Sequence, residues 1–408
     1  MNIEEIFTDT LKAREILSKA IHITPLDFSA TYSRMFKAKI FLKLENLQKT
    51  GSFKVRGAYY KIWSIPKEER KGVVAASAGN HAQGVAFAAT KQGIPSIIVM
   101  PETAPISKID ATRNYGAKVV LYGRVYDDAL KKAMEIVEEK GYTFVHPFDD
   151  PKVIAGQGTI LHEAFMQLGE PPDIIITPIG GGGLASGLIV VARHLWGNKT
   201  RIVGVEPSYA PKFTESLKHG HPIRVPAHPG IMDGLVVKVP GKLTFEIISE
   251  YIDDIVTVDD KEVSEAIYML LERNKTLAEG AGAAPLAALL TGKVEVENSE
   301  KVLLIISGGN IDPTRLVRVI NYELGRGHRI VRLEGLIPDE PGSLNRVLEI
   351  VASARLNIID IRHDRISPVL EPGWAKIEVY AEAPSEESVN NVLEKLNGEG
   401  FPFKLLRY

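Results

Sequence analysis

Residues 173–196 read DIIITPIGGGGLASGLIVVARHLW, and this stretch decides the fold. The apolar run Asp173–Pro178 predicts a buried strand, and Leu184–Trp196 has the length and apolar content of a helix. Between them stand the consecutive glycines Gly180, Gly181, Gly182 and Gly183. Glycines at a helix start let the backbone approach an anion, because N–H groups point outward at the positive helix end. We interpret the tetrad as a phosphate cup; the alternative, a tight turn, needs fewer glycines.

The same alternation of apolar strand and helix extends on both sides of this stretch, from about residue 39 to residue 307. The expected strands are Gly72–Ala76, Ser96–Met100, Lys118–Leu121, Asp173–Pro178, Arg201–Val205 and Lys301–Ser307. The expected helices are Asn80–Gln92, Ala104–Tyr115, Tyr126–Lys140, Gly158–Leu168, Leu184–Trp196 and Lys261–Arg273. Fully apolar strands with helices between them indicate parallel sheets covered on both faces. We therefore expect an α/β core with two lobes around a cleft.

The carboxyl end has a different pattern. After the polar helical stretch Asp312–Gly327, the order of expected elements is strand, helix, strand, strand, helix, strand. They are HRIVRLEGL (328–336), a helix from Gly342, NIIDIRHDRI (357–366), WAKIEVYAE (374–382), the helix Ser385–Leu396 and FKLLRY (403–408). This order predicts a ferredoxin-like α+β domain. We place the boundary between Gly325 and Arg329, with a core of residues 1–325 and a second domain of residues 326–408.

Composition excludes several classes of protein. Of 408 residues, 45% are apolar and 25% charged, as in a soluble globular protein. Lys plus Arg number 49 and Asp plus Glu 51, so the formal charge of -2 disfavours a nucleic-acid partner. No apolar stretch approaches the roughly 20 residues that cross a membrane, and the acidic amino terminus is unlike a signal peptide, so we expect a cytoplasmic protein. The absence of cysteine excludes disulfides, thiolate metal sites and cysteine nucleophiles.

A lysine within a run of small residues is a candidate for covalent chemistry. Residues 45–58 read ENLQKTGSFKVRGA, in which Lys54 follows Gly51, Ser52 and Phe53. Taken alone, Lys54 is a surface charge. Beside a phosphate site it becomes a candidate amine that holds an aldehyde cofactor as a Schiff base.

Two further polar segments stand at strand ends. Residues 77–84 read SAGNHAQG, and their small residues free N–H groups at a helix start for a carboxylate. Asn80 can donate or accept there, whereas His81 is an acid–base candidate or a capping and packing residue. Residues 307–310 read SGGN, and Ser307 ends a strand, where α/β proteins bind ligands; a plain polar turn is the alternative. His219, His221 and His228 lie without helical spacing and are expected to be surface histidines.

The glycine tetrad also fits a rival function. Gly180, Gly182 and Ala185 match G-x-G-x-x-G/A, and Glu206 follows at the end of the next strand. This is the spacing of a dinucleotide site in which the acid binds a ribose hydroxyl. On this segment alone, an NAD-dependent dehydrogenase is an open alternative.

Together the segments ENLQKTGSFKVRGA, SAGNHAQG, GGGGLASG, AEGAGA (278–283) and SGGN resemble the threonine ammonia-lyases, or threonine dehydratases. These belong to the tryptophan-synthase-β-like pyridoxal-phosphate enzymes. The resemblance spans essentially the whole chain and implies that the glycine tetrad holds the phosphate of that cofactor. It therefore favours a lyase over the dehydrogenase.

The resemblance also implies roles for individual residues. Lys54 would form the Schiff base and take the α-proton, Ser307 would bind the pyridine nitrogen, and Asn80 would bind the phenolic oxygen. Phe53 would lie near the ring, and Gly180, Gly181, Gly182, Gly183 and Leu184 would bind the phosphate. Ser77, Gly79 and His81 would contact the substrate carboxylate.

Two positions depart from close relatives. Serine racemases have a serine where Ala78 stands, and it serves as the acid or base on the second face, so racemisation is not expected. Relatives that bind a divalent cation have an aspartate where Lys212 stands, with a glutamate at the position of Glu206. We expect an ion pair of Lys212 with Glu206 in place of a metal, and predict no metal site.

The terminal domain resembles the ACT domains that regulate amino-acid enzymes. Its DEPGSL, Asp339–Leu344, matches the turn at which such domains bind amino acids, and Asn357 and Ile358 of the next strand would lie nearby. Candidate regulatory residues are Asp339, Gly342, Leu344, Asn357 and Ile358. Because Leu336, Ile337, Leu344 and Ile358 offer apolar side chains, we expect isoleucine or valine as an allosteric effector. Open sheet edges favour pairing, so we expect a homo-oligomer, a dimer or a tetramer.

We therefore predict a pyridoxal-phosphate-dependent lyase that converts L-threonine to 2-oxobutanoate and ammonia, and L-serine to pyruvate. The alternatives are an NAD-dependent dehydrogenase and a non-catalytic amino-acid sensor. The sequence leaves open whether the enzyme serves isoleucine biosynthesis or catabolism.

Overall fold

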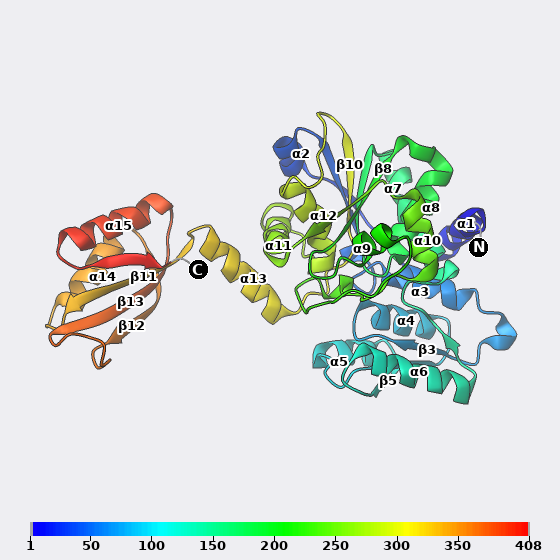
Figure 1. The fold of residues 1–408 in the computed structure, drawn as a ribbon, viewed down its shortest axis with the longest axis horizontal. Helices are drawn as coiled ribbons and strands as arrows, with labels where there is room; N and C mark the ends of the chain where they lie inside the picture. Colours follow the sequence, from blue (N-terminus) through cyan, green and yellow to red (C-terminus); the bar gives the residue numbers. More distant parts are fainter. Residues whose placement is uncertain (1–2, 407–408) are drawn as a thin grey trace. The chain divides into compact units, whose positions relative to one another are not determined.

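The computed structural model describes residues 3–406, and the chain divides into two compact units, Met1–Ile311 and Asp312–Tyr408. Each unit has its own hydrophobic core. Figure 1 shows the elements of each unit, which are described separately below.

The smaller lobe of the first unit is built on a four-stranded parallel sheet with the order β5-β4-β3-β6. Its elements are β3 (Val73–Ala76), α4 (Asn80–Lys91), β4 (Ser96–Met100), α5 (Ile106–Asn114), β5 (Lys118–Leu121), α6 (Tyr126–Lys140) and β6 (Thr143–Phe144). Helices α4 and α5 pack on one face, and α6 packs on the other. The apolar strands Val73–Ala76 and Ser96–Met100 are buried throughout, as their sequences predict.

The larger lobe is built on a six-stranded sheet with the order β1-β2-β10-β7-β8-β9, in which only β1 is antiparallel to its neighbour. Its strands are β1 (Leu26–Phe28), β2 (Lys39–Leu44), β7 (Ile174–Pro178), β8 (Arg201–Pro207), β9 (Asp254–Val258) and β10 (Lys301–Ile306). One face carries α1 (Ile3–Leu17), α7 (Pro151–Leu168), α8 (Gly183–Trp196) and α10 (Lys242–Tyr251). The sheet also packs against α12 (Gly280–Leu290), which contacts α11 (Asp260–Asn274). Helix α2 (Ala30–Phe36) contacts β2, and α9 (Lys212–His219) contacts the edge strand β9. The two-lobed parallel core is confirmed.

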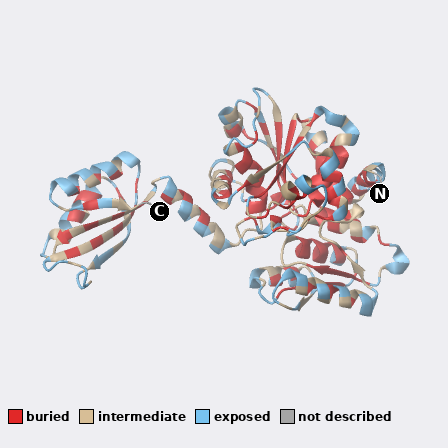
Figure 2. Ribbon diagram, viewed as in Figure 1, coloured by how far each residue is buried: buried red, intermediate tan, exposed pale blue. Residues whose placement is uncertain are grey.

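Helix α3 (Lys54–Trp63) belongs to both lobes. Its Ala58 and Ile62 enter the core of the smaller lobe, whereas Val55 and Tyr60 enter the core of the larger one. The backbone that carries Lys54 is therefore held between two packed cores, and Figure 2 shows this helix largely buried.

Two helices differ from the sequence prediction. Helix α7 begins at Pro151 and not at Gly158, because the Asp150 side chain caps the N–H groups of Lys152 and Val153 with proline in the first turn. Helix α12 was not predicted. It is buried throughout its Gly- and Ala-rich sequence, contains Pro285, and so has no polar face to produce a helical period.

The second unit contains the predicted ferredoxin-like order of elements. It comprises α13 (Pro313–Arg326), β11 (Ile330–Pro338), α14 (Ser343–Ser353), β12 (Asn357–Asp364), β13 (Trp374–Glu382), α15 (Glu386–Gly398) and β14 (Phe403–Leu406). The antiparallel sheet has the order β12-β13-β11-β14, and α14 and α15 pack on one of its faces. Arg407 and Tyr408 of the predicted last strand lie outside the described residues. The structural division precedes α13, whereas the predicted boundary at residue 325 falls at its end; that boundary stays a prediction.

Of the four apolar residues expected to line an effector pocket, Ile337, Leu344 and Ile358 share one hydrophobic cluster and Leu336 lies outside it. Leu336 and Ile337 are neighbours in β11, so their side chains point to opposite faces of the sheet. Ile337 is 1% exposed in the core under the helices. The described part of this unit has a cavity of about 360 Å³ elsewhere, lined by Asn321, Ile330, Ile359, Asp360, Arg362 and Tyr380.

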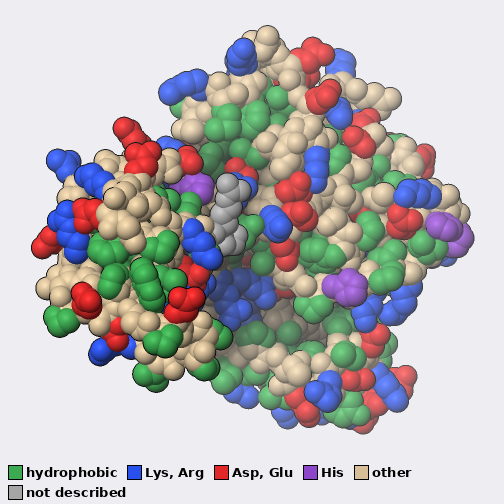
Figure 3. Space-filling view, turned by 60° about the vertical axis from the view of Figure 1, so that its left-hand side comes forward, with side chains coloured by type: hydrophobic (Ala, Val, Ile, Leu, Met, Phe, Trp, Pro, Cys, Tyr) green, Lys and Arg blue, Asp and Glu red, His purple; other side chains and the backbone are tan. Residues whose placement is uncertain are grey.

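No helix within residues 3–406 has the length and apolar character needed to cross a membrane. On the face shown in Figure 3, acidic and basic side chains are interspersed over both units, in keeping with the small net charge of -2.

Candidate active site

Lys54 opens α3 at the junction of the two lobes. Its amine nitrogen donates a hydrogen bond to the Pro147 carbonyl oxygen at 2.9 Å and lies 5.2 Å from the centre of the Phe53 ring. Burial lowers the pKa of the Lys54 amine to about 8, although the negative charge of Glu279 acts in the opposite direction. A neutral amine is a nucleophile and a base, so this environment suits both roles predicted for Lys54.

The glycine tetrad forms the entry to α8. Gly182 has φ +96° and caps the helix, a conformation that favours glycine over residues with a side chain. A Cβ atom would lie 2.2 Å from the Phe148 ring at Gly181, and 2.7 Å from Thr244 and Phe213 at Gly182. The loop therefore excludes side chains, and its backbone N–H groups stand at the start of a 14-residue helix, as a phosphate site requires.

A short segment connects the lysine to the glycine loop. Pro147 accepts the Lys54 hydrogen bond, and the next residue, Phe148, packs its ring against Gly181 and its backbone against Gly183. Lys54 and the glycine tetrad therefore border one site, although 126 positions separate Lys54 from Gly180 in the sequence.

The end of β10 lies against the segment before Lys54. The Phe53 N–H donates to the Ser307 carbonyl at 3.0 Å, and the Gly309 N–H donates to the Gly51 carbonyl at 2.9 Å. Ser52 forms an isolated bridge with Gly308. Ser307, which is 2% exposed, is therefore placed beside Phe53 and Lys54 by the backbone.

Asn80, at the start of α4, is joined to two residues of the larger lobe. Its Nδ2 donates to Glu279 Oε1 at 2.6 Å, and its Oδ1 accepts from Asn310 Nδ2 at 2.8 Å. Glu279, 6% exposed, was not predicted as a site residue. The only signal was its place in AEGAGA, because the contact joins positions 199 residues apart.

The segment SAGN is the open part of this site. Ser77, Gly79 and Asn80 are half-buried, and a Cβ atom added at Gly79 would meet nothing within 4 Å. The Gly79 N–H donates to Ser77 Oγ at 3.2 Å, so the turn supports itself. The free space at Gly79 leaves room for a small ligand beside the N–H groups that begin α4.

The His81 side chain is buried and bonded to the backbone. Its Nε2 lies 2.8 Å from the Val145 carbonyl, and burial together with the Lys54 charge lowers the pKa of the ring to about 3. The ring is neutral, 3% exposed and bonded to the backbone, which favours a packing residue over an acid–base residue. The predicted contact of His81 with the substrate carboxylate stays a prediction.

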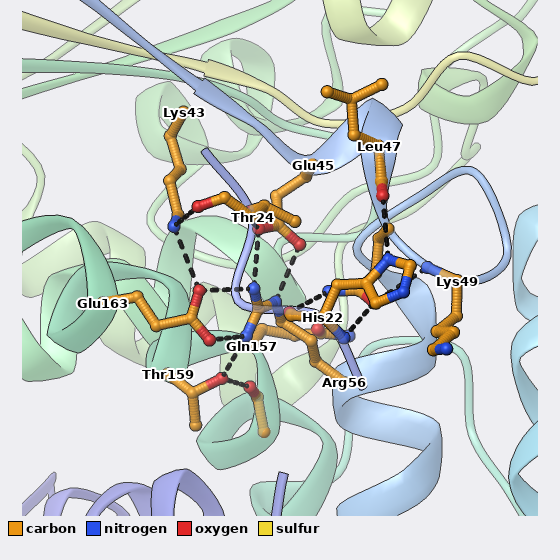
Figure 4. Close-up of polar contacts among 12 residues, drawn as sticks. His22, Thr24, Lys43, Glu45, Leu47, Lys49, Arg56, Gln157, Thr159 and Glu163 are labelled. Atoms are coloured by element: carbon orange, nitrogen blue, oxygen red, sulfur yellow. Dashed lines mark hydrogen bonds and ion pairs between the residues drawn. The ribbon is translucent and has the colours of Figure 1, made fainter. Parts of the chain in front are cut away.

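A buried ionic network holds the first turn of α3 (Figure 4). Arg56, which is fully buried, makes two hydrogen bonds to Glu45 at 2.7 and 2.8 Å and two to Glu163 at 2.6 and 2.8 Å. Lys43 binds Glu163 at 3.0 Å, so two cations face two carboxylates. The network fixes the helix that begins at Lys54 to β2 and α7 of the larger lobe.

Glu206 and Lys212 form the expected ion pair. The two side chains are fully buried, with 3.1 Å between Lys212 Nζ and Glu206 Oε2, and Lys212 also donates to the Ile179 carbonyl. Glu206 further accepts from the Phe213 and Thr214 N–H groups and the Thr214 hydroxyl. Burial lowers the pKa of Lys212, and Glu206 opposes that shift.

These contacts rule out the role of Glu206 in a dinucleotide site, because its carboxylate is enclosed and its oxygens are used. The dehydrogenase alternative was therefore wrong. Within residues 3–406 no group of three or more His, Asp and Glu side chains is arranged to hold a metal ion, and His219 and His221 bond to nearby backbone carbonyls.

The donors around Lys54 fit a cofactor with an aldehyde and a phosphate. Lys54 supplies an amine, the glycine loop supplies N–H groups at a helix start, and Asn80 and Ser307 supply further polar groups. Ser52 Oγ is buried without a hydrogen-bond partner within the described residues, so one donor next to Lys54 is left for a ligand.

The predicted regulatory residues occupy two parts of the second unit. Asp339 pairs with Arg365 at 2.7 and 3.1 Å, and Gly342, with φ +103°, caps α14. Leu344 and Ile358 pack at the edge of the core, and Asn357 binds Glu382 at 3.1 Å. The charge of Asp339 is therefore already compensated by Arg365, which lowers the pKa of the Asp339 carboxyl.

Known proteins resemble this chain along most of its length. Residues 17–308 match the family described as pyridoxal-phosphate dependent enzyme. The L-threonine ammonia-lyase of Thermotoga maritima is 45% identical over 399 residues, covering 98% of each chain. The solved threonine deaminase isoform 2 of Solanum lycopersicum is 36% identical with a TM-score of 0.74, over 78% of this chain and 87% of that one. Maize serine racemase is 34% identical with a TM-score of 0.73, over 79% of this chain and 98% of that one.

Proposed function

The chain belongs to the pyridoxal-phosphate-dependent enzymes, and we propose that it is an L-threonine ammonia-lyase that forms 2-oxobutanoate and ammonia. The observation that carries this proposal is the shared site of Lys54, the glycine tetrad and the strand end at Ser307. A non-catalytic amino-acid sensor, the remaining alternative, is set aside because the chain is an enzyme of this family.

When bound, pyridoxal phosphate supplies an electron sink for the pair left behind when an amino acid loses its α-proton. The N–H groups of Gly180 to Leu184, at the start of α8, would hold its phosphate. Lys54 would hold the cofactor through its aldehyde group, and its Nζ would accept the α-proton of the substrate. Burial favours both steps, because it lowers the pKa of Lys54 to about 8 and so raises the share of neutral amine.

Ser307 and Asn80 set the polarity of the cofactor ring. A serine hydroxyl at the pyridine nitrogen is neutral and does not enforce a proton there, so the electron sink is weak and loss of the β-hydroxyl group is favoured. Asn80 would donate an N–H to the phenolic oxygen of the cofactor, and Phe53 would lie beside its ring. The backbone N–H groups of the segment from Ser77 to His81 hold the substrate carboxylate in the open space at Gly79.

The same site is proposed to deaminate L-serine to pyruvate and not to racemise it. Serine differs from threonine by one methyl group, which a pocket discriminates weakly. Racemisation needs a proton donor on the face opposite Lys54. Ala78 has no titratable group, in contrast to the serine implied for the racemases.

Regulation and assembly are proposed for the second unit. It is an ACT domain whose turn Asp339–Leu344, with Asn357 and Ile358, binds isoleucine or valine and controls the enzyme allosterically. The open edges β12 and β14 support a dimer or a tetramer. Isoleucine sensitivity would favour a role in isoleucine biosynthesis over a role in catabolism. The expected cytoplasmic location stays a prediction.

The test is a steady-state assay of the full chain with pyridoxal phosphate. We expect 2-oxobutanoate from L-threonine, a slower or comparable release of pyruvate from L-serine, and no D-serine. Isoleucine, added at fixed threonine, is expected to change the rate by about 5- to 150-fold, the range of ordinary allosteric coupling. Absence of 2-oxo acid from both substrates contradicts the proposed function, and an unchanged rate contradicts only its regulation.

A further inference from the structure

The side-chain amide of Asn80 has one neighbour on each side. Its Nδ2 donates to Glu279 and its Oδ1 accepts from Asn310. An ionised carboxylate can only accept and an amide nitrogen can only donate, so the two neighbours together allow a single orientation of the Asn80 amide. In that orientation the amide nitrogen keeps one N–H that Glu279 does not use.

These contacts extend across the two lobes. Asn80 begins α4 of the smaller lobe, whereas Glu279 precedes α12 and Asn310 follows β10 of the larger lobe. Lys108 on α5 donates to the Asn310 carbonyl at 2.6 Å, and Asn310 Nδ2 also donates to the Thr50 carbonyl at 2.8 Å. Asn80 is therefore oriented by groups outside its own helix.

We propose that Glu279 is a positioning residue for the cofactor: its ionised carboxylate holds the Asn80 amide so that an N–H, and not the amide oxygen, faces the phenolic oxygen of pyridoxal phosphate. This inference rests on the proposed role of Asn80 in the site. A flipped amide would place its oxygen against that electron-rich oxygen, and the two acceptors would repel each other.

The orientation depends on the charge of Glu279. Burial and the nearby Asp233 raise the pKa of Glu279 to about 7, although Lys108, the Asn80 hydrogen bond and Lys54 all act to lower it. A protonated carboxyl group can donate as well as accept, so it no longer selects one orientation of Asn80. Cofactor affinity should therefore fall as the pH falls through the Glu279 titration.

The test measures the dissociation constant of pyridoxal phosphate for the apoprotein between pH 8.5 and 6, in the Lys54→Ala background. Without Lys54 no covalent link forms and its own titration is removed. The pKa of Glu279 is then expected at or above about 7, because the variant lacks the Lys54 cation that lowers it. The ligand phosphate titrates near about 6 in every variant, so it cancels in the comparison.

Three proteins are compared: Lys54→Ala, Lys54→Ala with Glu279→Gln, and Lys54→Ala with Glu295→Gln as a control at an exposed glutamate. Between pH 8.5 and 6, we expect the affinity for pyridoxal phosphate to drop about tenfold more in the two proteins that retain Glu279 than in the protein with Glu279→Gln. This difference is the size expected for loss of a charge-assisted hydrogen bond. The glutamine side chain has no charge and can both donate and accept, so it does not select one orientation of Asn80. The Glu279→Gln variant should therefore bind pyridoxal phosphate more weakly at pH 8.5. Its pH dependence should reflect only the titration of the cofactor phosphate.

Parallel curves for all three proteins overturn the proposal. Glu279→Asp in the same background guards against plain structural damage, because it should keep the pH dependence even if affinity drops at every pH. If the cofactor is not retained without Lys54, wild type and Glu279→Gln are compared through the visible absorbance of bound cofactor, and parallel curves there overturn the proposal too. Failure of wild type to bind the cofactor at any pH would instead contradict the proposed function.

Discussion

The ammonium nitrogen of Lys212 lies 3.1 Å from Glu206, and neither side chain is exposed. A cation that belongs to the protein therefore stands beside this acid. We expect deamination of threonine to be independent of divalent metals. Exhaustive treatment with a chelator should leave the rate within about twofold of the untreated enzyme, a change below about 0.5 kcal/mol in activation free energy. Activity that disappears and returns with magnesium or calcium would refute this substitution of lysine for metal.

Arg56 should be essential to the stability of the lysine-bearing helix. Its guanidinium group satisfies Glu45 and Glu163 together, and Arg56→Met would leave buried carboxylates with Lys43 as their remaining cation. We expect a loss of about 3–5 kcal/mol in the free energy of unfolding, measured with urea. Arg56→Lys keeps the charge but lacks the planar fork, so its loss should be smaller. Equal stability of wild type and Arg56→Met would show that the network does not hold α3.

The pKa of Lys54 can be measured on the apoprotein by competitive acetylation and mass spectrometry of its peptide. Burial disfavours the charged form and lowers the pKa, so reactivity should rise with pH and reach half its maximum near about pH 8 rather than near the usual lysine value. The charge of Glu279 raises this pKa, so Glu279→Gln should shift the midpoint to lower pH. A midpoint above about 10 in the wild type would mean that Lys54 is solvated.

Ser307→Asp tests the neutral partner of the cofactor nitrogen. A carboxylate there would keep a proton on the pyridine ring and delocalise negative charge more strongly, so loss of the β-hydroxyl group should be less favoured. We expect at least about tenfold slower formation of 2-oxobutanoate, or about 1.4 kcal/mol in activation free energy, with an altered spectrum of bound cofactor. Ser307→Ala, which removes the hydroxyl without adding charge, is the matched control. Unchanged rate and spectrum in the aspartate variant would remove Ser307 from the ring nitrogen.

The parts of the fold predicted from sequence are those with a strong local signal. Buried strands such as Ser96–Met100 and the alternating strand Trp374–Glu382 have the predicted bounds, because apolar runs and period-two alternation are local properties. Helix α12 has no such signal, since burial on all sides removes the polar face. Helix α7 begins earlier than predicted because Asp150 caps it and Pro151 occupies its first turn. The prediction followed the apolar residues alone and did not use this cap.

The site was predicted to a similar extent. The glycine tetrad had a local signal, small residues between a buried strand and a helix, whereas Lys54 became a candidate only beside that phosphate site and through the family resemblance. Glu279 could not be predicted from spacing, because its function depends on Asn80, a residue brought next to it by the tertiary fold. Of the apolar residues expected around the effector, Leu336 and Ile337 point to opposite faces of their strand, and the effector site itself stays a prediction.

The central claim is that Lys54 binds the cofactor and moves the α-proton of threonine. The most direct measurement is the steady-state rate of 2-oxobutanoate formation by Lys54→Ala and wild type, at saturating threonine and pyridoxal phosphate, with the absorbance of bound cofactor recorded in parallel. We predict that the variant stays folded, loses the visible band and is slower by at least about 10³-fold, since one amine performs both tasks. A folded Lys54→Ala variant that retains a substantial part of the wild-type rate would contradict the account.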